Sequence, residues 1–107
     1  MTVDEFNTQY KNGDILVVGE EWVLIFYGIG EGQYPFEDRH TILYHAVAHI
    51  HHGSIYEKIP PGPGIGWVED ESNSKVRYAT NSEIDIILRR LASHGFKWDS
   101  ENLTLSL

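Results

Sequence analysis

Short apolar runs, separated by turn signals, fill the first quarter of the chain. Residues 15–18 (ILVV) and 22–27 (WVLIFY) are two such runs, with Gly-Glu-Glu between them at residues 19–21. Asparagine and glycine tolerate the backbone conformation of tight turns, so residues 12–14 (NGD) indicate a turn into the first run. The pattern predicts a β-hairpin. The segment before it, residues 6–12, is expected to fray or to form one helical turn.

The next strand is predicted from an alternation over residues 41–50. Isoleucine, tyrosine and alanine at even positions alternate with leucine, histidine and valine at odd positions. A period of two is typical of a strand with one packed face. A helix is the competing interpretation, but the β-branched and aromatic content favours the strand. Residues 28–38, which lead into it, are rich in glycine and are predicted to form a flexible loop.

Proline, glycine and polar residues divide the segment that follows. Residues 59–64 (IPPGPG) can form neither a helix nor a central strand, so an extended connection is predicted there. Two short strands are expected at residues 66–69 and 75–79, with a polar turn between them at residues 70–74.

The clearest predicted element is a helix that begins after Thr80. Thr80 and Glu83 have the spacing of a capping box, and Gly95 is placed to end the helix in the left-handed conformation. One apolar stripe follows the i, i+3, i+4, i+7 spacing of a helix face and consists of Ile84, Ile87, Leu88 and Leu91. Alternating segments at residues 96–99 and 103–107 then predict a closing hairpin.

These elements predict one α+β domain, residues 1–107, in which β structure predominates. Several short strands followed by one helix and a hairpin are typical of a small, strongly bent antiparallel sheet. The expected arrangement is an SH3-like, partly open barrel with the C-terminal helix against one end.

The composition of the chain excludes some kinds of site and partner and indicates where in the cell the protein is found. The 107 residues carry a formal charge of −8 and no cysteine, which excludes disulfides and thiolate metal sites. The chain offers no basic face for nucleic acid and no apolar run of the ~20 residues that a membrane span needs. Because the first residues lack the basic and apolar regions of a signal peptide, we expect a cytoplasmic protein.

Histidines gather around the predicted strand at residues 41–50. If that segment is a strand, His45, His49 and His51 share one face, and the Cα atoms of His49 and His51 lie ~7 Å apart. Two imidazoles at this spacing can hold one metal ion, and Glu57 would add a carboxylate, so Zn²⁺ or Fe²⁺ is the expected cofactor of such a site. The alternative is a solvent-facing or groove-lining strand whose histidines are merely polar, with no cofactor.

Aromatic residues are spread over the predicted sheet, and most of them are expected to fill the core. Those on or near loops are candidates for contacts with a protein partner, because loops held by rigid strands commonly carry binding function. The predicted partner-binding residues are Tyr34, Phe36, Tyr56 and Trp67.

The sequence contains none of the common catalytic sets. There is no cysteine and no Gly-x-Ser-x-Gly motif. The glycines at residues 28–32 lead into Gln-Tyr-Pro-Phe-Glu-Asp rather than into a helix, so they do not form a nucleotide site. No catalytic residue is predicted, and a non-enzymatic protein is favoured.

The C-terminal part of the chain carries a family resemblance. Residues 77–83 (RYATNSE), the helix after them and residues 95–99 (GFKWD) are similar to the tails of small uncharacterised proteins of phages and prophages in gut anaerobes. The resemblance implies an origin in such an element and a barrel-plus-helix architecture. It implies no activity and no catalytic residue.

Three functions follow from these observations. The first is a non-enzymatic accessory or protein-binding module of a phage or mobile element. The second is a metal-binding protein or metalloenzyme that uses His45, His49, His51 and Glu57. The third is an acidic inhibitor that occupies the basic groove of a nucleic-acid-binding protein, which the charge of −8 would favour.

Overall fold

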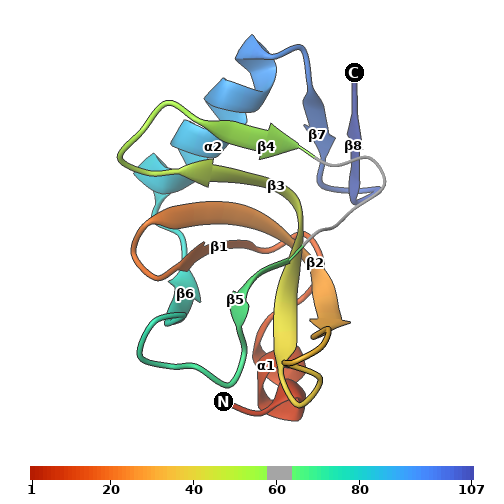
Figure 1. The fold of residues 1–107 in the computed structure, drawn as a ribbon. Helices are drawn as coiled ribbons and strands as arrows, with labels where there is room; N and C mark the ends of the chain where they lie inside the picture. Colours follow the sequence, from red (N-terminus) through yellow and green to blue (C-terminus); the bar gives the residue numbers. More distant parts are fainter. Residues whose placement is uncertain (58–63) are drawn as a thin grey trace.

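The computed structural model describes residues 1–57 and 64–107, which form a bent antiparallel sheet with one helix near each end (Figure 1). The elements in chain order are α1 (Val3–Gln9), β1 (Ile15–Val18), β2 (Trp22–Glu31), β3 (His40–His49), β4 (Ile55–Glu57), β5 (Gly64–Trp67), β6 (Val76–Tyr78), α2 (Asn81–Ser93), β7 (Lys97–Asp99) and β8 (Thr104–Ser106). The predicted connection at residues 59–64 lies, except for Gly64, outside the described residues.

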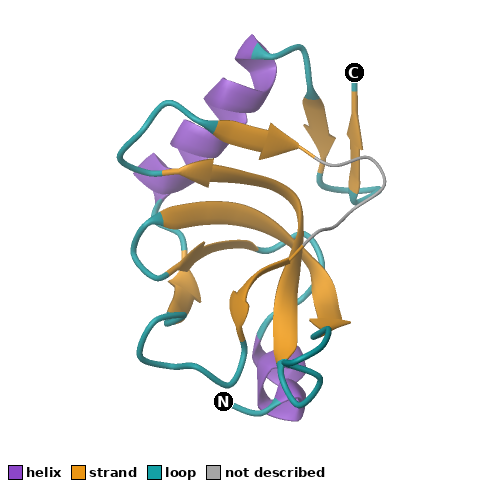
Figure 2. Cartoon of the chain, in the orientation of Figure 1, coloured by secondary structure: helices purple, strands orange, loops and turns teal. Residues whose placement is uncertain are grey.

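The main sheet has the strand order β4-β3-β2-β1-β6, and β5 also pairs with β3. β4 pairs with residues 46–48 and β5 with residues 41–43, so these two strands follow one another along the same edge of β3. β2 and β3 are long and strongly curved, and the β7–β8 hairpin stands beside α2 (Figure 2). The predicted bent antiparallel sheet with a C-terminal helix and a closing hairpin is confirmed. The sheet is open rather than a closed barrel.

The central strands are packed on both faces. The cluster on the side of α1, called the α1-side core, consists of Phe6, Tyr10, Leu16, Val18, Leu24, Phe26, Ile42, Tyr44, Val47 and Val68. The α2-side core consists of Val17, Val23, Ile25, Ala46, Ala48, Ile55, Ile87, Leu91 and Leu105. Burial on both faces explains why β1 and β2 are continuous apolar runs rather than alternating ones. The expected single packed face of residues 41–50 is therefore wrong, although the strand itself is confirmed.

Two compensating bulges interrupt the pairing of β2 with β3. The register passes from Ile25↔Ala46 to Phe26↔Tyr44, which leaves His45 as an extra residue on β3. It then passes to Gly28↔Leu43, which leaves Tyr27 as an extra residue on β2. A bulge changes the face to which the following side chains point. Tyr44 consequently lies in the α1-side core, whereas Ala46 lies in the α2-side core.

The first segment is a capped helix rather than a fraying end. The Thr2 side chain accepts a hydrogen bond from the Glu5 N–H, and the Glu5 carboxylate accepts one from the Thr2 N–H. This capping box starts α1, whose Phe6 is buried in the α1-side core. The prediction of a single turn at residues 6–12 is corrected accordingly.

The glycines of residues 28–31 also belong to a strand, because β2 continues to Glu31. Gly30 packs closely against the neighbouring strand: a Cβ at this position would lie 2.9 Å from a terminal methyl group of Leu43, which would have to shift. Of the predicted loop at residues 28–38, only residues 32–38 lie outside a strand. β5 begins two residues before the predicted strand at 66–69, and β6 lies within the predicted strand at 75–79.

α2 begins and ends where the sequence indicates. Thr80 and Glu83 form the capping box, and Gly95 has a φ of +82°. The buried face differs from the predicted stripe, because Ile87 and Leu91 are buried whereas Leu88 is 37% exposed. Within residues 1–57 and 64–107, no helix has the length and apolar content that crossing a membrane requires.

Candidate functional site

His45 lies at the bulge of β3, where it is buried at 3% exposure. Its Nε2 is 2.9 Å from Oδ1 of Asn12, and because a carboxamide oxygen only accepts, Nε2 carries the proton. The imidazole is enclosed by the rings of Tyr27 and Trp98, with centroids 5.3 Å and 4.7 Å away. Burial disfavours the charged form and lowers the pKa of His45.

His45 is therefore expected to titrate below its usual pKa of 6.5 in the folded protein. Since the unfolded chain takes up this proton more readily, the free energy of unfolding should fall as the pH drops below 6.5. Histidine-selective NMR measures the midpoint, and urea unfolding at two pH values measures the stability. The variant His45→Gln, which does not titrate, should lose this part of the pH dependence. A His45 midpoint at or above 6.5 would contradict the burial argument.

His49, His51 and His52 gather at the turn between β3 and β4. The His49 ring lies 4.3 Å from that of His52, 5.9 Å from that of His51 and 4.7 Å from that of Trp22. Desolvation and the neighbouring His52 lower the pKa of His49. Arg90 of α2 donates hydrogen bonds to the carbonyl oxygens of His49 and Ser54, which holds the turn against the helix.

The structure brings together two of the four predicted metal ligands, because the rings of His49 and His51 lie 5.9 Å apart. His45 is separate from this pair: it lies four residues from His49 on one strand, about 13 Å at the usual rise. The expected common face of the three histidines is therefore wrong, because the bulge redirects His45. Glu57 is paired with Ala46 at the end of β4. Among the described residues, no group of three or more histidines and carboxylates is arranged to hold a metal ion.

Three of the four predicted partner-binding residues do come together. Tyr34 and Phe36, on the loop after β2, and Trp67, at the end of β5, line an open groove of about 600 Å³. The rings of Phe36 and Trp67 lie 5.5 Å apart. Tyr34 is 87% exposed and Phe36 is 42% exposed, so neither side chain is buried in the hydrophobic core. Tyr56 is also exposed, but it lies on β4, paired with Val47 and away from this groove.

The groove wall is a hydrogen-bonded loop. The Gly32 N–H donates to the Arg39 carbonyl, and the Phe36 N–H donates to the Gln33 carbonyl at 2.6 Å. A Cβ on Gly32 would collide with the carbonyl oxygens of Phe36 and Arg39, so only glycine fits this position. These contacts give a defined backbone conformation to the segment that carries Tyr34 and Phe36. This part of the predicted loop consists of two consecutive turns.

Two glycines of β5, Gly64 and Gly66, lie at the groove floor. A Cβ on Gly64 would collide with the Thr41 side chain, and Gly66 has a φ of +67°. The Thr41 hydroxyl donates to the Gly66 carbonyl at 3.0 Å, and the Trp67 N–H donates to the Ser74 hydroxyl at 3.1 Å. Thus β5 is held in place by side-chain hydrogen bonds, and its glycines allow Thr41 and Ser74 to pack closely against it.

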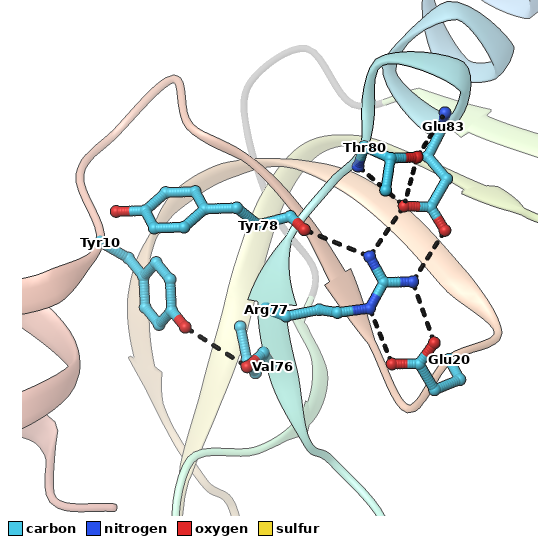
Figure 3. A network of polar contacts seen from close by, with 7 residues as sticks. All are labelled: Tyr10, Glu20, Val76, Arg77, Tyr78, Thr80 and Glu83. Atoms are coloured by element: carbon cyan, nitrogen blue, oxygen red, sulfur yellow. Dashed lines mark hydrogen bonds and ion pairs between the residues drawn. The ribbon is translucent and has the colours of Figure 1, made fainter.

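A second polar cluster joins the turn after β1 to the start of α2 (Figure 3). Arg77 donates two hydrogen bonds to the Glu20 carboxylate and two to the Glu83 carboxylate. The donor–acceptor distances are between 2.8 and 2.9 Å. The Arg77 guanidinium lowers the pKa of Glu83 to about 2, and the Thr80 N–H and hydroxyl also lower it. Because the charges and hydrogen-bonding groups of these side chains pair with one another, the cluster has a structural role: it links the β1–β2 turn, β6 and α2. Sequence reasoning placed Glu20 in a loop and missed this role.

The described lining of the groove is mostly uncharged. Among these residues, the ionisable groups are Glu31 and Tyr34, and neither is paired there with a histidine or a second carboxylate. The exposed aromatic rings beside the hydrogen-bonded loop form a surface on which an apolar ligand segment can pack. No protein-family model, curated protein or solved structure matches the chain.

Proposed function

We propose that the protein is a non-enzymatic protein-binding module whose aromatic groove takes a short, extended, proline-containing segment of a partner chain. The observation that carries this proposal is the convergence of Tyr34, Phe36 and Trp67 around one open groove. The likeness of residues 77–83 and 95–99 to phage and prophage proteins supports a role as an accessory protein of such an element.

Physical chemistry favours a proline-containing ligand. Single exposed aromatic residues are common on protein surfaces and need no explanation. Three that line one groove form a contiguous apolar patch, which is typical of an interaction site. An extended proline segment is already ordered before it binds, so it loses little conformational entropy. Its flat apolar rings pack on aromatic side chains, which is how grooves of this type recognise polyproline segments.

The proposal can be tested by following Trp67 directly. Protein labelled with 5-fluorotryptophan should give three ¹⁹F resonances, from Trp22, Trp67 and Trp98. The variant Trp67→Phe identifies the groove signal. Titration with a synthetic ten-residue peptide of alternating proline and alanine should move the Trp67 resonance alone. Absence of any shift at millimolar peptide, or a shift confined to Trp22 or Trp98, would refute the proposed site.

The variant Phe36→Ala is expected to weaken this binding about tenfold, because truncating an aromatic contact at the centre of an interface typically costs more than 1 kcal/mol. Tyr56→Ala is the matched control, since Tyr56 is an exposed aromatic residue outside the groove. Isothermal titration calorimetry measures both affinities, and thermal unfolding checks that both variants remain folded. Equal weakening by the two substitutions would mean that binding does not depend on the groove.

A further inference from the structure

We infer that the partner segment is basic: an extended, proline-containing peptide flanked by lysine or arginine. This inference rests on the proposed function and adds the charge of the ligand. It is argued from three carboxylates: Glu31, which lines the groove, and Glu37 and Asp38, which directly follow the groove residue Phe36 in the chain. They are called the acidic rim below.

The acidic rim flanks Tyr34 and Phe36 along the chain, because Glu31 is the last residue of β2 and Glu37 and Asp38 lie shortly before β3. Glu31 lines the groove itself. Glu37 and Asp38 occupy the centre of the turn that the Arg39 N–H closes on the Phe36 carbonyl at 3.0 Å, so they directly follow a groove residue. A peptide lying across Phe36 and Trp67 would pass close to these carboxylates.

The rim carboxylates are available to a ligand. All three residues are exposed, and none forms an ion pair with another of the described residues. This distinguishes them from carboxylates with a structural partner elsewhere in the fold, such as Glu69 beside His40 and Glu83 beside Arg77. The rim therefore contributes negative charge to the surface and has no ion-pair partner within residues 1–57 and 64–107.

Arg39 offsets part of this charge and leaves the segment 31–39 with a formal charge of −2. It is the one cation of the segment 31–39, which also holds the three rim carboxylates, and its guanidinium lies over the Phe36 ring at 5.5 Å from the centroid. The formal charge of the whole chain, −8, has the same sign as the rim and would attract a cationic peptide from solution. The faces of aromatic rings also attract cations. An acidic segment or a nucleic-acid backbone would be repelled by the same groups.

The test compares three peptides with one proline-alanine core and flanks of lysine, glutamine or glutamate. At 20 mM salt the lysine peptide should bind about tenfold more tightly than the glutamine peptide, and the glutamate peptide should bind most weakly. At 300 mM salt the three affinities should converge, because screening removes attraction between exposed charges. Calorimetry and the Trp67 ¹⁹F resonance give the affinity and the place of binding.

Matched variants locate the charge effect. Glu37→Gln combined with Asp38→Asn should reduce affinity for the lysine peptide about fivefold and leave the glutamine peptide unchanged. Glu21→Gln combined with Glu101→Gln removes the same number of charges from the β1–β2 turn and the β7–β8 turn. This control should reduce affinity only slightly.

The outcomes separate the inference from the function on which it rests. Equal binding of the lysine and glutamine peptides at Trp67 would overturn the basic-ligand inference and leave the groove as a peptide site. Equal loss in the two double variants would also overturn it, because the effect would then come from net charge rather than from the rim. If no peptide of any charge moves the Trp67 resonance, both proposals fail.

Discussion

The variant Phe6→Ala is expected to lower the free energy of unfolding by about 3–5 kcal/mol, the usual cost of removing a buried phenylalanine ring. Phe6 is 1% exposed, and its ring lies 4.8 Å from that of Tyr10 and 5.3 Å from that of Phe26. It is the buried residue through which α1 joins the α1-side core. Because a domain of this kind has a total stability of about 5–15 kcal/mol, the variant should unfold at far lower urea concentration.

Phe36→Ala is the control for this prediction, because it removes the same ring from the groove. Phe36 is 42% exposed and is expected to contribute about 1 kcal/mol or less. Urea unfolding followed by far-UV circular dichroism measures both variants, and Phe6→Leu gives a milder comparison if Phe6→Ala does not fold. Equal losses at Phe6 and Phe36 would mean that the groove ring is a core residue, and the binding argument would lose its basis.

The contrast between the two helices shows what local sequence signals can predict. α2 was predictable because its capping residues Thr80 and Glu83 stand before a run of apolar residues long enough to show helical spacing. α1 has the same signal in Thr2 and Glu5, but it spans only seven residues and buries one of them. Helices of that length are unstable in isolation. Its stability comes from the packing of Phe6 against residues distant in the sequence, which the local pattern does not contain.

The groove was only partly predictable for a related reason. Tyr34, Phe36 and Trp67 were candidates because they lie on or near loops, but their convergence depends on β5 pairing with residues 41–43 of β3. By sequence, Tyr56 was an equally plausible partner-binding residue. It lies apart from the groove because β4 pairs with residues 46–48, further along the same edge of β3.

The predicted common face of His45, His49 and His51 is wrong because of a single extra residue. The bulge at His45 breaks the period of two, and a one-residue shift exchanges the two faces of a strand. The consequence is that His45 lies against Asn12, Tyr27 and Trp98, apart from the imidazoles gathered at the end of the same strand. Sequence spacing alone could not reveal this separation.

Arg77→Met is expected to lower the free energy of unfolding by about 2 kcal/mol at pH 7, and the loss should depend on pH. The Glu83 side chain is only 14% exposed, and it accepts two hydrogen bonds from Arg77 in the cluster drawn in Figure 3. Together with Thr80, these bonds lower the pKa of Glu83 from 4.5 to about 2. Methionine keeps much of the apolar stem of arginine but removes the charge and the donors.

The direction of the pH dependence follows from that lowered pKa. Ionised Glu83 stabilises the folded state fully above pH 4.5, where the unfolded chain is also ionised, and the stabilisation is lost as the pH falls towards 2. The difference between the wild type and Arg77→Met should therefore be largest at pH 7 and should shrink between pH 4.5 and pH 2. Urea midpoints at pH 7, 4 and 2.5 measure this change.

Arg89→Met is the matched control, because Arg89 also pairs with a carboxylate but at the surface. The side chains of Arg89 and Asp85 are 80% and 57% exposed, so this substitution should change stability by about 0.5 kcal/mol or less at every pH. A pH-independent loss in Arg77→Met would contradict a stabilising role of the pair of Arg77 and ionised Glu83. A loss that shrinks on acidification would instead identify the pair of Arg77 and Glu83 as the contact that fixes β6 to the first turn of α2.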